Sequence, residues 1–425
     1  AGLKHKALFD FKHAGQCFNR IITIISNESK YDSKESLSTD NYKHLINSQI
    51  QLINIYINIG KWNETEKLIL NLRSIKIKDD KMHCLFLQEG AVYYSLNRKF
   101  DISADFLNQA LKIAKSIDNK SYIAKITGLL ADNMYDTGNL QSALDEFKNE
   151  LKLFILIKDD LAIGNAYSHL GKTYLGLGDL KLSFKHFNLM YDIAKKYDSK
   201  QMQLHALGNI SLIHNIRGEY KKSIKLYKEV METAEDIYDL RSQAQTYGNL
   251  GIIYKNLDEY NLALSNNKKQ LRIAQKLNDK LQIANAFSNF GIVNQKIGNF
   301  KDSIDYHEKN ISLQKDIDDN IGIARSFTNL SITYFDQGKL DKAKKYLSKG
   351  LKIFTKYGDK RSVNLGNFEL SKFLQFEENY NQGITSIKLA IDFFEEQNDT
   401  VLLIRSYNRI ARLYRLNNNT KSAIV

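Results

Sequence analysis

The sequence predicts an all-α protein built as a solenoid of about ten helical hairpins. A short turn motif recurs along the 425 residues, at a spacing of 40 over most of the chain. Apolar and small residues recur at fixed distances from each turn, which predicts one buried stripe on each helix. The chain contains no proline, whereas average usage would give roughly 20. Proline ends helices, so its absence favours long helices joined by very short connections.

Ten short turns set the register of the hairpins. From the second turn to the tenth the step is 40 residues, and the first step is two residues shorter. The turns begin at Gly60, Arg98, Gly138, Gly178, Gly218, Asp258, Gly298, Gly338, Glu378 and Asn418. The stretches between turns are long enough for one antiparallel helix pair per unit.

Each unit carries the same signals around its turn. Small residues lie seven positions before it, as at Gly171 and Ser211, and five positions after it, as at Ser183 and Ser223. Small residues at these positions let the two helices of a hairpin approach closely. Aspartates precede the first helices and are expected to accept hydrogen bonds from free amides of the first turn. These aspartates are Asp159, Asp239, Asp279, Asp319, Asp359 and Asp399.

The segments Leu170-Gly171-Lys172-Thr173-Tyr174 and Leu250-Gly251-Ile252-Ile253-Tyr254 resemble the tetratricopeptide repeat (TPR). The 40-residue unit is similar to that of the Leu-Gly-Asn repeat protein and Pins group, and to arrays in bacterial signalling TPR proteins. The common TPR unit has 34 residues, and six more residues add about 9 Å of helix. The resemblance implies a right-handed superhelix whose first helices line a concave groove.

The pattern predicts three regions along the chain. Residues 1–25 are expected to form a partial N-terminal repeat, and the polar residues 26–41 a loop or insertion. Residues 42–425 are expected to form the TPR superhelix, with its last repeat truncated. A solenoid normally has polar capping units, so we expect more protein beyond both ends.

The resemblance places repeat positions two, six and nine in the groove, which are thirteen, nine and six residues before each turn. Position six is asparagine in four successive repeats, and position nine is aliphatic in the same repeats. The predicted peptide-binding residues are Asn209, Asn249, Asn289, Asn329, Leu212, Ile252, Ile292 and Ile332. A carboxamide both donates and accepts hydrogen bonds and can hold the backbone of an extended peptide. The alternative is that these asparagines bond between neighbouring helices.

A basic patch is predicted at the C-terminal end of the same face. Its residues are Arg325, Lys372, Arg405, Arg409, Arg412 and Arg415. Arginine suits bidentate recognition of carboxylates and phosphates, so the patch favours an acidic ligand. The alternative is that regions of the same chain outside this sequence cover this face and supply the acids.

We find no catalytic motif, no metal site and no cofactor signature, so no enzyme is predicted within these residues. His169 and His205 occupy neighbouring groove positions and His214 lies one helix face away, but a metal site needs a third ligand with fixed geometry. Two cysteines, Cys17 and Cys84, fit a reducing compartment such as the cytoplasm. The chain has no apolar run of membrane-spanning length.

The sequence therefore predicts a protein-interaction scaffold that binds an extended, acidic peptide or partner domain. We expect it to be the sensor or regulatory part of a larger signalling protein. The alternative is a helical-repeat protein that binds RNA, which the net charge of +13 permits. Against that reading, the groove centre lacks the aromatic side chains on which bases stack.

Overall fold

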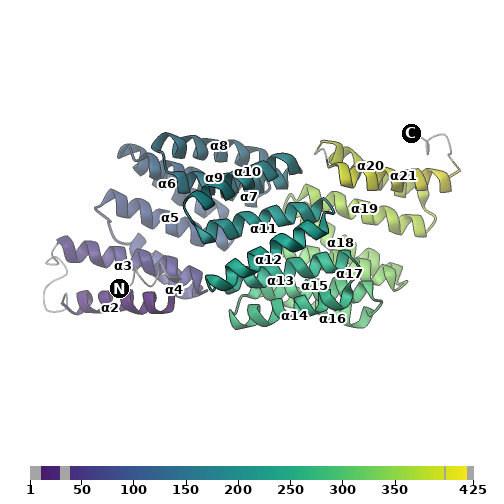
Figure 1. Ribbon diagram of the computed structural model, residues 1–425, viewed down its shortest axis with the longest axis horizontal. Helices are drawn as coiled ribbons and strands as arrows, with labels where there is room; N and C mark the ends of the chain where they lie inside the picture. Colours follow the sequence, from purple (N-terminus) through teal and green to yellow (C-terminus); the bar gives the residue numbers. More distant parts are fainter. Residues whose placement is uncertain (1–10, 29–38, 397–398, 419–425) are drawn as a thin grey trace. The chain divides into compact units, whose positions relative to one another are not determined.

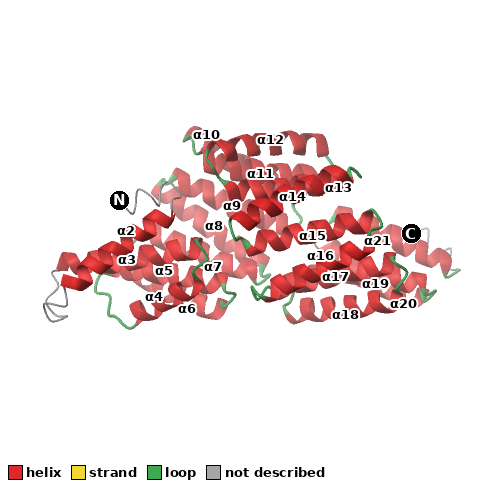
Figure 2. Ribbon diagram, turned by 90° about the horizontal axis from the view of Figure 1, so that it is seen from below, coloured by secondary structure: helices red, strands yellow, loops and turns green. Residues whose placement is uncertain are grey.

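The computed structural model describes residues 11–28, 39–396 and 399–418. These residues form 20 helices, and no strand occurs among them (Figures 1 and 2). The chain divides into two compact units, residues 1–160 and 161–425. The prediction of an all-α solenoid is confirmed, because successive helices pack against each other as hairpins.

The first unit contains seven of the described helices. They are α2 (Phe11–Glu28), α3 (Thr39–Asn58), α4 (Trp62–Arg73), α5 (Asp80–Leu96), α6 (Phe100–Ser116), α7 (Lys120–Asp136) and α8 (Leu140–Ile157). Helix α2 packs on α3, α5 on α6, and α7 on α8. Helix α4 is five residues shorter than α5 and is followed by a six-residue connection, which accounts for the irregular first step of the repeat.

The second unit holds the candidate site and consists of regular helices, of which α9 starts at the junction residue Asp160. They are α9 (Asp160–Gly176), α10 (Leu180–Lys196), α11 (Lys200–Ile216), α12 (Tyr220–Asp236), α13 (Leu240–Asn256), α14 (Tyr260–Lys276), α15 (Lys280–Lys296), α16 (Phe300–Lys315), α17 (Asn320–Asp336), α18 (Leu340–Lys356), α19 (Lys360–Phe376), α20 (Tyr380–Glu396) and α21 (Thr400–Leu416). Odd-numbered helices are the first helices of their hairpins. From α11 to α21, each first helix also contacts the next first helix.

Most described turns end a helix with one left-handed residue, the connection after α4 being an exception, and proline is not needed for this purpose. At the turn after α9, Gly178 has φ 83°, and the amide of Asp179 donates to the carbonyl of Tyr174 at 2.9 Å. This six-residue hydrogen-bonded closure is the Schellman motif, in which glycine is favoured. Other turns place a residue with a side chain there, such as Tyr238 at φ 56°.

Aspartates start the first helices as predicted. Predicted caps accept a hydrogen bond from the backbone amide three residues later at five first helices, for example Asp319 from Gly322 at 2.9 Å. These caps are Asp239, Asp279, Asp319, Asp359 and Asp399. The structure adds caps that the pattern missed, among them Asp79 and Asn119 in the first unit.

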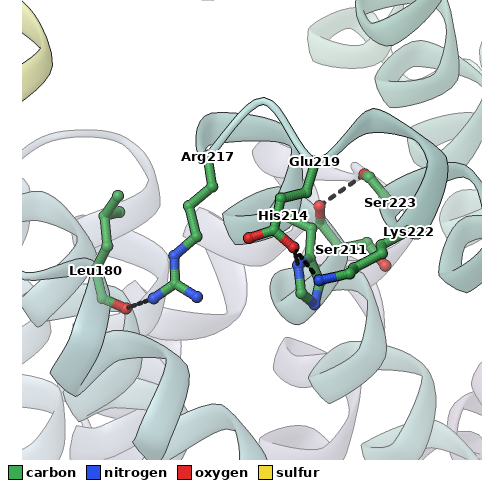
Figure 3. A network of polar contacts seen from close by, with 7 residues as sticks. All are labelled: Leu180, Ser211, His214, Arg217, Glu219, Lys222 and Ser223. Atoms are coloured by element: carbon green, nitrogen blue, oxygen red, sulfur yellow. Dashed lines mark hydrogen bonds and ion pairs between the residues drawn. The ribbon is translucent and has the colours of Figure 1, made fainter.

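Small residues beside the turns bring the two helices of a hairpin into hydrogen-bonding distance. The Ser223 hydroxyl donates to the carbonyl of Ser211 at 2.7 Å, across the turn between α11 and α12 (Figure 3). The turn itself is held by Glu219, whose carboxylate lies 3.1 Å from His214 Nδ1 and 2.6 Å from Lys222 Nζ. Arg217 reaches back to the carbonyl of Leu180 at 3.3 Å and joins this hairpin to the preceding one.

The ends of the chain are only partly described. Helix α2 spans Phe11–Glu28, so it starts within the region expected to form a partial N-terminal repeat and ends three residues beyond the predicted limit at residue 25. The predicted loop at 26–41 is mostly outside the described residues, and α2 and α3 extend into it from either side. The predicted domain boundaries stay predictions. Residues 419–425, which include the end of the tenth turn and the predicted truncated repeat, lie outside the described residues.

Candidate binding groove on the first helices

All eight predicted groove residues lie at comparable places on the first helices of the second unit. Their side chains are half-buried, whereas the residue that follows each asparagine is fully buried. The eight residues are Asn209, Asn249, Asn289, Asn329, Leu212, Ile252, Ile292 and Ile332. Spacings of three and four residues hold them on one helical face. Because α11, α13, α15 and α17 contact one another in turn, these positions form a row from helix to helix.

Three of the asparagines form hydrogen bonds within the protein. Two of these bonds join neighbouring helices, as the alternative interpretation of the asparagines expected. Asn289 donates to Gln270 Oε1 on α14 at 3.3 Å, and Asn329 donates to Ser288 Oγ on α15 at 3.4 Å. Asn209 donates to the carbonyl of His205 in its own helix at 2.8 Å. A carboxamide has two N–H bonds and a carbonyl oxygen, so each of these contacts uses one donor and leaves further bonding capacity.

Asn249 faces a buried phenol. Tyr227 on α12 is 1% exposed, and its hydroxyl has no hydrogen-bond partner among the described residues. Burial raises the pKa of Tyr227, and the nearby Asn249 side chain opposes part of this rise. The Asn249 carboxamide is thus a polar neighbour of the phenol that lies outside hydrogen-bond geometry.

Three predicted residues meet at one cavity of about 350 Å³ in the second unit. They are Ile292 on α15, together with Arg325 and Asn329 on α17. The rest of the lining is Asn285, Ser288, Asn310, Gln314, Gly322, Ser326, Thr328, Phe354, Ser362 and Leu365. The cavity therefore joins groove positions of α15, α17 and α19 to residues of the second helices α16 and α18.

Sequence reasoning missed the second-helix residues of this cavity. Asn310 and Gln314 are 1% and 6% exposed, and both contact the hydroxyl of Ser326, at 3.0 Å and 3.1 Å respectively. The signal was present, because the positions equivalent to Asn310 on α10 and α12 carry Met190 and Val230. A polar residue at a repeat position that is apolar on α10 and α12 indicates that this residue does more than fill the core.

Several side chains of the basic patch already contact other residues of the protein. Arg405 and Arg409 lie over the ring of Phe368, at 5.3 Å and 5.6 Å from its centroid. Arg325 approaches Asp319 at 3.9 Å, and Lys372 approaches Asp336 at 3.9 Å. Arg405, Arg412 and Arg415 are exposed and make no ion pair with a described residue.

A carboxylate of the protein already sits within this patch. Burial raises the pKa of Glu369, while the charges of Lys372, Arg405 and Arg409 oppose that rise. Arg409 is half-buried and donates to Gln375 Oε1 at 3.1 Å. The patch thus contains an acid from the described array itself, on α19, and the alternative that regions outside this sequence supply the acids stays open.

The histidines considered as metal ligands do not converge. His214 lies against Glu219 at the turn, 3.1 Å away, whereas His205 contacts Gln201 at 3.2 Å. Among the residues that the structure describes, no group of three or more histidine, cysteine, aspartate or glutamate side chains could hold a metal ion. No helix in the described part of the chain combines the length and apolarity that a membrane span requires.

The Tetratricopeptide repeat family model matches residues 202–276, 242–309 and 282–356. The matched stretches overlap in steps of 40 residues and contain the four predicted asparagines. No curated protein sequence matches the chain.

Solved structures share the fold at low sequence identity. A Rap protein complexed with competence and sporulation factor matches with a TM-score of 0.61 and 13% identity, over 83% of this chain and 98% of that one. The apo form of the quorum sensor NprR from B. thuringiensis matches with 0.55 and 15%, over 82% and 98%. The Rap conjugation gene regulator of plasmid pLS20, in complex with the Phr* peptide, matches with 0.53 and 17%, over 68% and 81%.

Proposed function

Because residues 202–356 are tetratricopeptide repeats, we propose that this protein is a scaffold that binds an extended peptide along its first helices. The observation that carries the proposal is the row of half-buried Asn209, Asn249, Asn289 and Asn329, with one aliphatic residue beside each. Packed helices lie roughly 10 Å apart, which corresponds to about three residues of extended chain. Carboxamides at that spacing suit backbone amides, and the aliphatic residues suit alternate side chains.

The structural neighbours support this class of ligand. Two of them were solved with a peptide or peptide factor bound, and a third is a quorum sensor. The likeness covers most of this chain at 13–17% identity, so it establishes a shared fold, and the class of ligand is carried over to this chain as a proposal. We infer a regulatory, non-catalytic role in signalling in the cytoplasm, because two of these neighbours are a gene regulator and a quorum sensor.

The ligand is proposed to be acidic where it meets the basic patch. Arg405 and Arg412 are exposed on α21, and Arg325 is exposed on α17. Arginine pairs bidentately with carboxylates, and the net charge of +13 attracts an anionic ligand over longer distances. The internal carboxylate of Glu369 lowers the positive potential of the patch, so the outer arginines carry this contact.

The test uses peptides selected from a random library displayed on phage. We expect the double substitution Asn249→Ala with Asn289→Ala to abolish binding of the selected peptides, while helicity and melting temperature change little. The matched control is Asn188→Ala with Asn266→Ala, which removes two carboxamides from the second helices α10 and α14. Binding that survives the groove substitutions, or that is lost equally in the control, contradicts the proposal.

RNA binding remains the second candidate because of the net charge of +13. The aromatic rings near the groove are poor platforms for bases, since lysine already covers some of them. Lys349 lies 5.4 Å from the ring centroid of Phe327 and 5.2 Å from that of Tyr346. Filter binding to random RNA at physiological salt separates the two classes, and saturable RNA binding with no selected peptide would favour the second candidate.

A further inference from the structure

Helix α16 carries a buried polar stripe at positions that are mostly apolar in other repeats. His307, Asn310 and Gln314 are 0%, 1% and 6% exposed. The corresponding residues are apolar on α10 (Phe187, Met190, Ala194) and α20 (Ile387, Ala390, Phe394) and almost entirely so on α12 (Tyr227, Val230, Ala234), whereas the preceding second helix α14 carries Asn267 and Gln270 before Ala274. Burying polar groups opposes folding unless they form hydrogen bonds. The buried polar side chains of α16 therefore call for a structural or functional explanation.

Asn310 is polar, buried and only half satisfied. Its Nδ2 donates to the Ser326 hydroxyl at 3.0 Å, whereas its Oδ1 has no hydrogen-bond partner among the described residues. Gln270 on the preceding second helix occupies the same repeat position, and both of its polar atoms have a partner: Nε2 donates to Gln282 and Oε1 accepts from Asn289. Unsatisfied buried acceptors are rare in native proteins, and this one lines the cavity of about 350 Å³.

The cavity has a buried floor and an exposed rim. Asn310, Gln314 and Ser326 form the floor, since each is less than a tenth exposed. Asn285 and Arg325 form the rim, and both are exposed at position two of their repeats. The cavity therefore opens onto the same row of first-helix positions that the proposed peptide would follow.

We propose that this cavity is a subsite of the groove for a carboxamide side chain, a glutamine or asparagine of the bound peptide. The inference rests on the proposed function. The ligand N–H bonds would meet the unpaired Asn310 Oδ1 once the buried Asn310 side chain turns toward the cavity, and the ligand carbonyl would accept from the hydroxyls of Ser288 or Ser362. The side-chain methylenes would lie against Ile292 and Phe354.

Other side-chain classes fit less well. A carboxylate only accepts, so it would leave Asn310 Oδ1 facing another acceptor. A lysine or arginine would pass the exposed guanidinium of Arg325 at the rim, and like charges repel. An aliphatic side chain would leave the buried acceptor unpaired. The N–H groups of a carboxamide can donate to Asn310 Oδ1, whose assignment as the amide oxygen is fixed because Asn310 Nδ2 donates to the Ser326 hydroxyl and that hydroxyl donates to Gln314.

The experiment selects peptides from a phage-displayed random library on the full 425-residue chain. We expect glutamine or asparagine to be enriched at one position of the selected peptides. Replacing that residue by leucine in a synthetic peptide should weaken binding at least about tenfold, because a site built to hydrogen-bond a group rejects an analogue without it. On Asn310→Leu the two peptides should bind alike.

The matched control is Asn267→Leu on α14. Asn267 is also buried and has no hydrogen-bond partner among the described residues, but it does not line the cavity. This variant should retain the preference for the carboxamide peptide. If Asn310→Leu does not fold, Ser362→Leu narrows the cavity from α19 and should weaken the carboxamide peptide selectively.

The outcomes separate the two proposals. Selected peptides without an enriched carboxamide, or an unchanged preference in Asn310→Leu and Ser362→Leu, would overturn the subsite while peptide binding stands. A chain that enriches no peptide at all would overturn both the subsite and the proposed function. Equal loss of preference in Asn267→Leu would show a general effect of the helices and would also overturn the subsite.

Discussion

Gly291 on α15 packs directly against the imidazole of His307 on α16, so closely that a β-carbon on Gly291 would lie 2.5 Å from His307 Cε1. The same relationship joins Gly251 to Asn267 and Gly171 to Phe187 in other hairpins. The small residue seven positions before the turn is thus matched to a large buried residue nine positions after it. Its smallness sets the distance between the helices of a hairpin.

This contact predicts opposite effects for two glycine substitutions in helix interiors. Gly291→Ala should lower the free energy of unfolding by about 1–3 kcal/mol, because the added methyl displaces a buried ring. Gly208→Ala on α11 should raise it by about 0.5–1 kcal/mol, since no atom lies within 4 Å of the added β-carbon and alanine favours helix. Urea denaturation followed by circular dichroism measures both, and a stabilising Gly291→Ala would refute the contact.

His307 should make the protein less stable in mild acid. Burial lowers the pKa of His307 from 6.5 to about 4. Between these pH values the imidazole of His307 binds a proton in the unfolded chain but not in the folded chain. The contribution of neutral His307 to the free energy of unfolding is therefore fully present above pH 6.5 and is lost as the pH drops toward 4. The loss attributable to this group is about 3 kcal/mol.

The comparison variant for that prediction is His307→Leu, because Leu347 occupies the equivalent position on α18. We expect its melting temperature to fall less than that of the unmodified protein between pH 7 and pH 5. Parallel pH profiles of the two proteins would exclude His307 as the source of the acid sensitivity.

Tyr238 should be replaceable by glycine with a gain in stability. It adopts φ 56° and is 88% exposed, so its side chain contributes little packing while its backbone is strained. Left-handed geometry costs a residue with a β-carbon roughly 1 kcal/mol, so Tyr238→Gly should raise the free energy of unfolding by somewhat less than this amount. The reverse change, Gly358→Ala, at φ 70° in the equivalent turn, should lower it. Differential scanning fluorimetry of both variants should show melting shifts of opposite sign.

Glu369 should restrain the affinity for acidic peptides. Glu369→Gln removes a negative charge beside Arg405 and Arg409, so an acidic peptide should bind a few-fold more tightly, and its binding should weaken more steeply with added salt. The control Glu232→Gln removes an exposed carboxylate from the second helix α12. Identical affinities of the two variants across a salt titration would place the ligand away from the patch.

The sequence was sufficient for the hairpin register. Turns, caps and small residues depend on local geometry, and they repeat often enough to be recognised without knowing the neighbouring helices. The strained turn residues could not be identified in this way. Tyr238 and Lys158 have left-handed backbone geometry because one helix ends and the next begins there, at a spacing of 20 residues. Residues with a β-carbon do not favour this geometry by themselves.

The candidate site was predicted less completely than the fold. The half-buried position of Asn249 follows from helical spacing, but the bond from Asn289 to Gln270 depends on how α15 packs on α14. The cavity was missed because only first helices were expected to line the groove, whereas its floor includes Asn310 from a second helix. Contacts between elements are set by packing, which a single repeat pattern does not encode.

From the second turn to the tenth, successive hairpins repeat every 40 residues, so the array has a constant period over most of its length. Deleting residues 242–281 would join Arg241 to Gln282, which occupies the place of Ser242 in the next hairpin. Every helix beyond the junction would meet a neighbour of the same kind, because contacts in the array reach only adjacent hairpins. Duplication or loss of one such unit in a gene could therefore lengthen or shorten the recognised peptide by a fixed increment while leaving the rest of the binding surface intact.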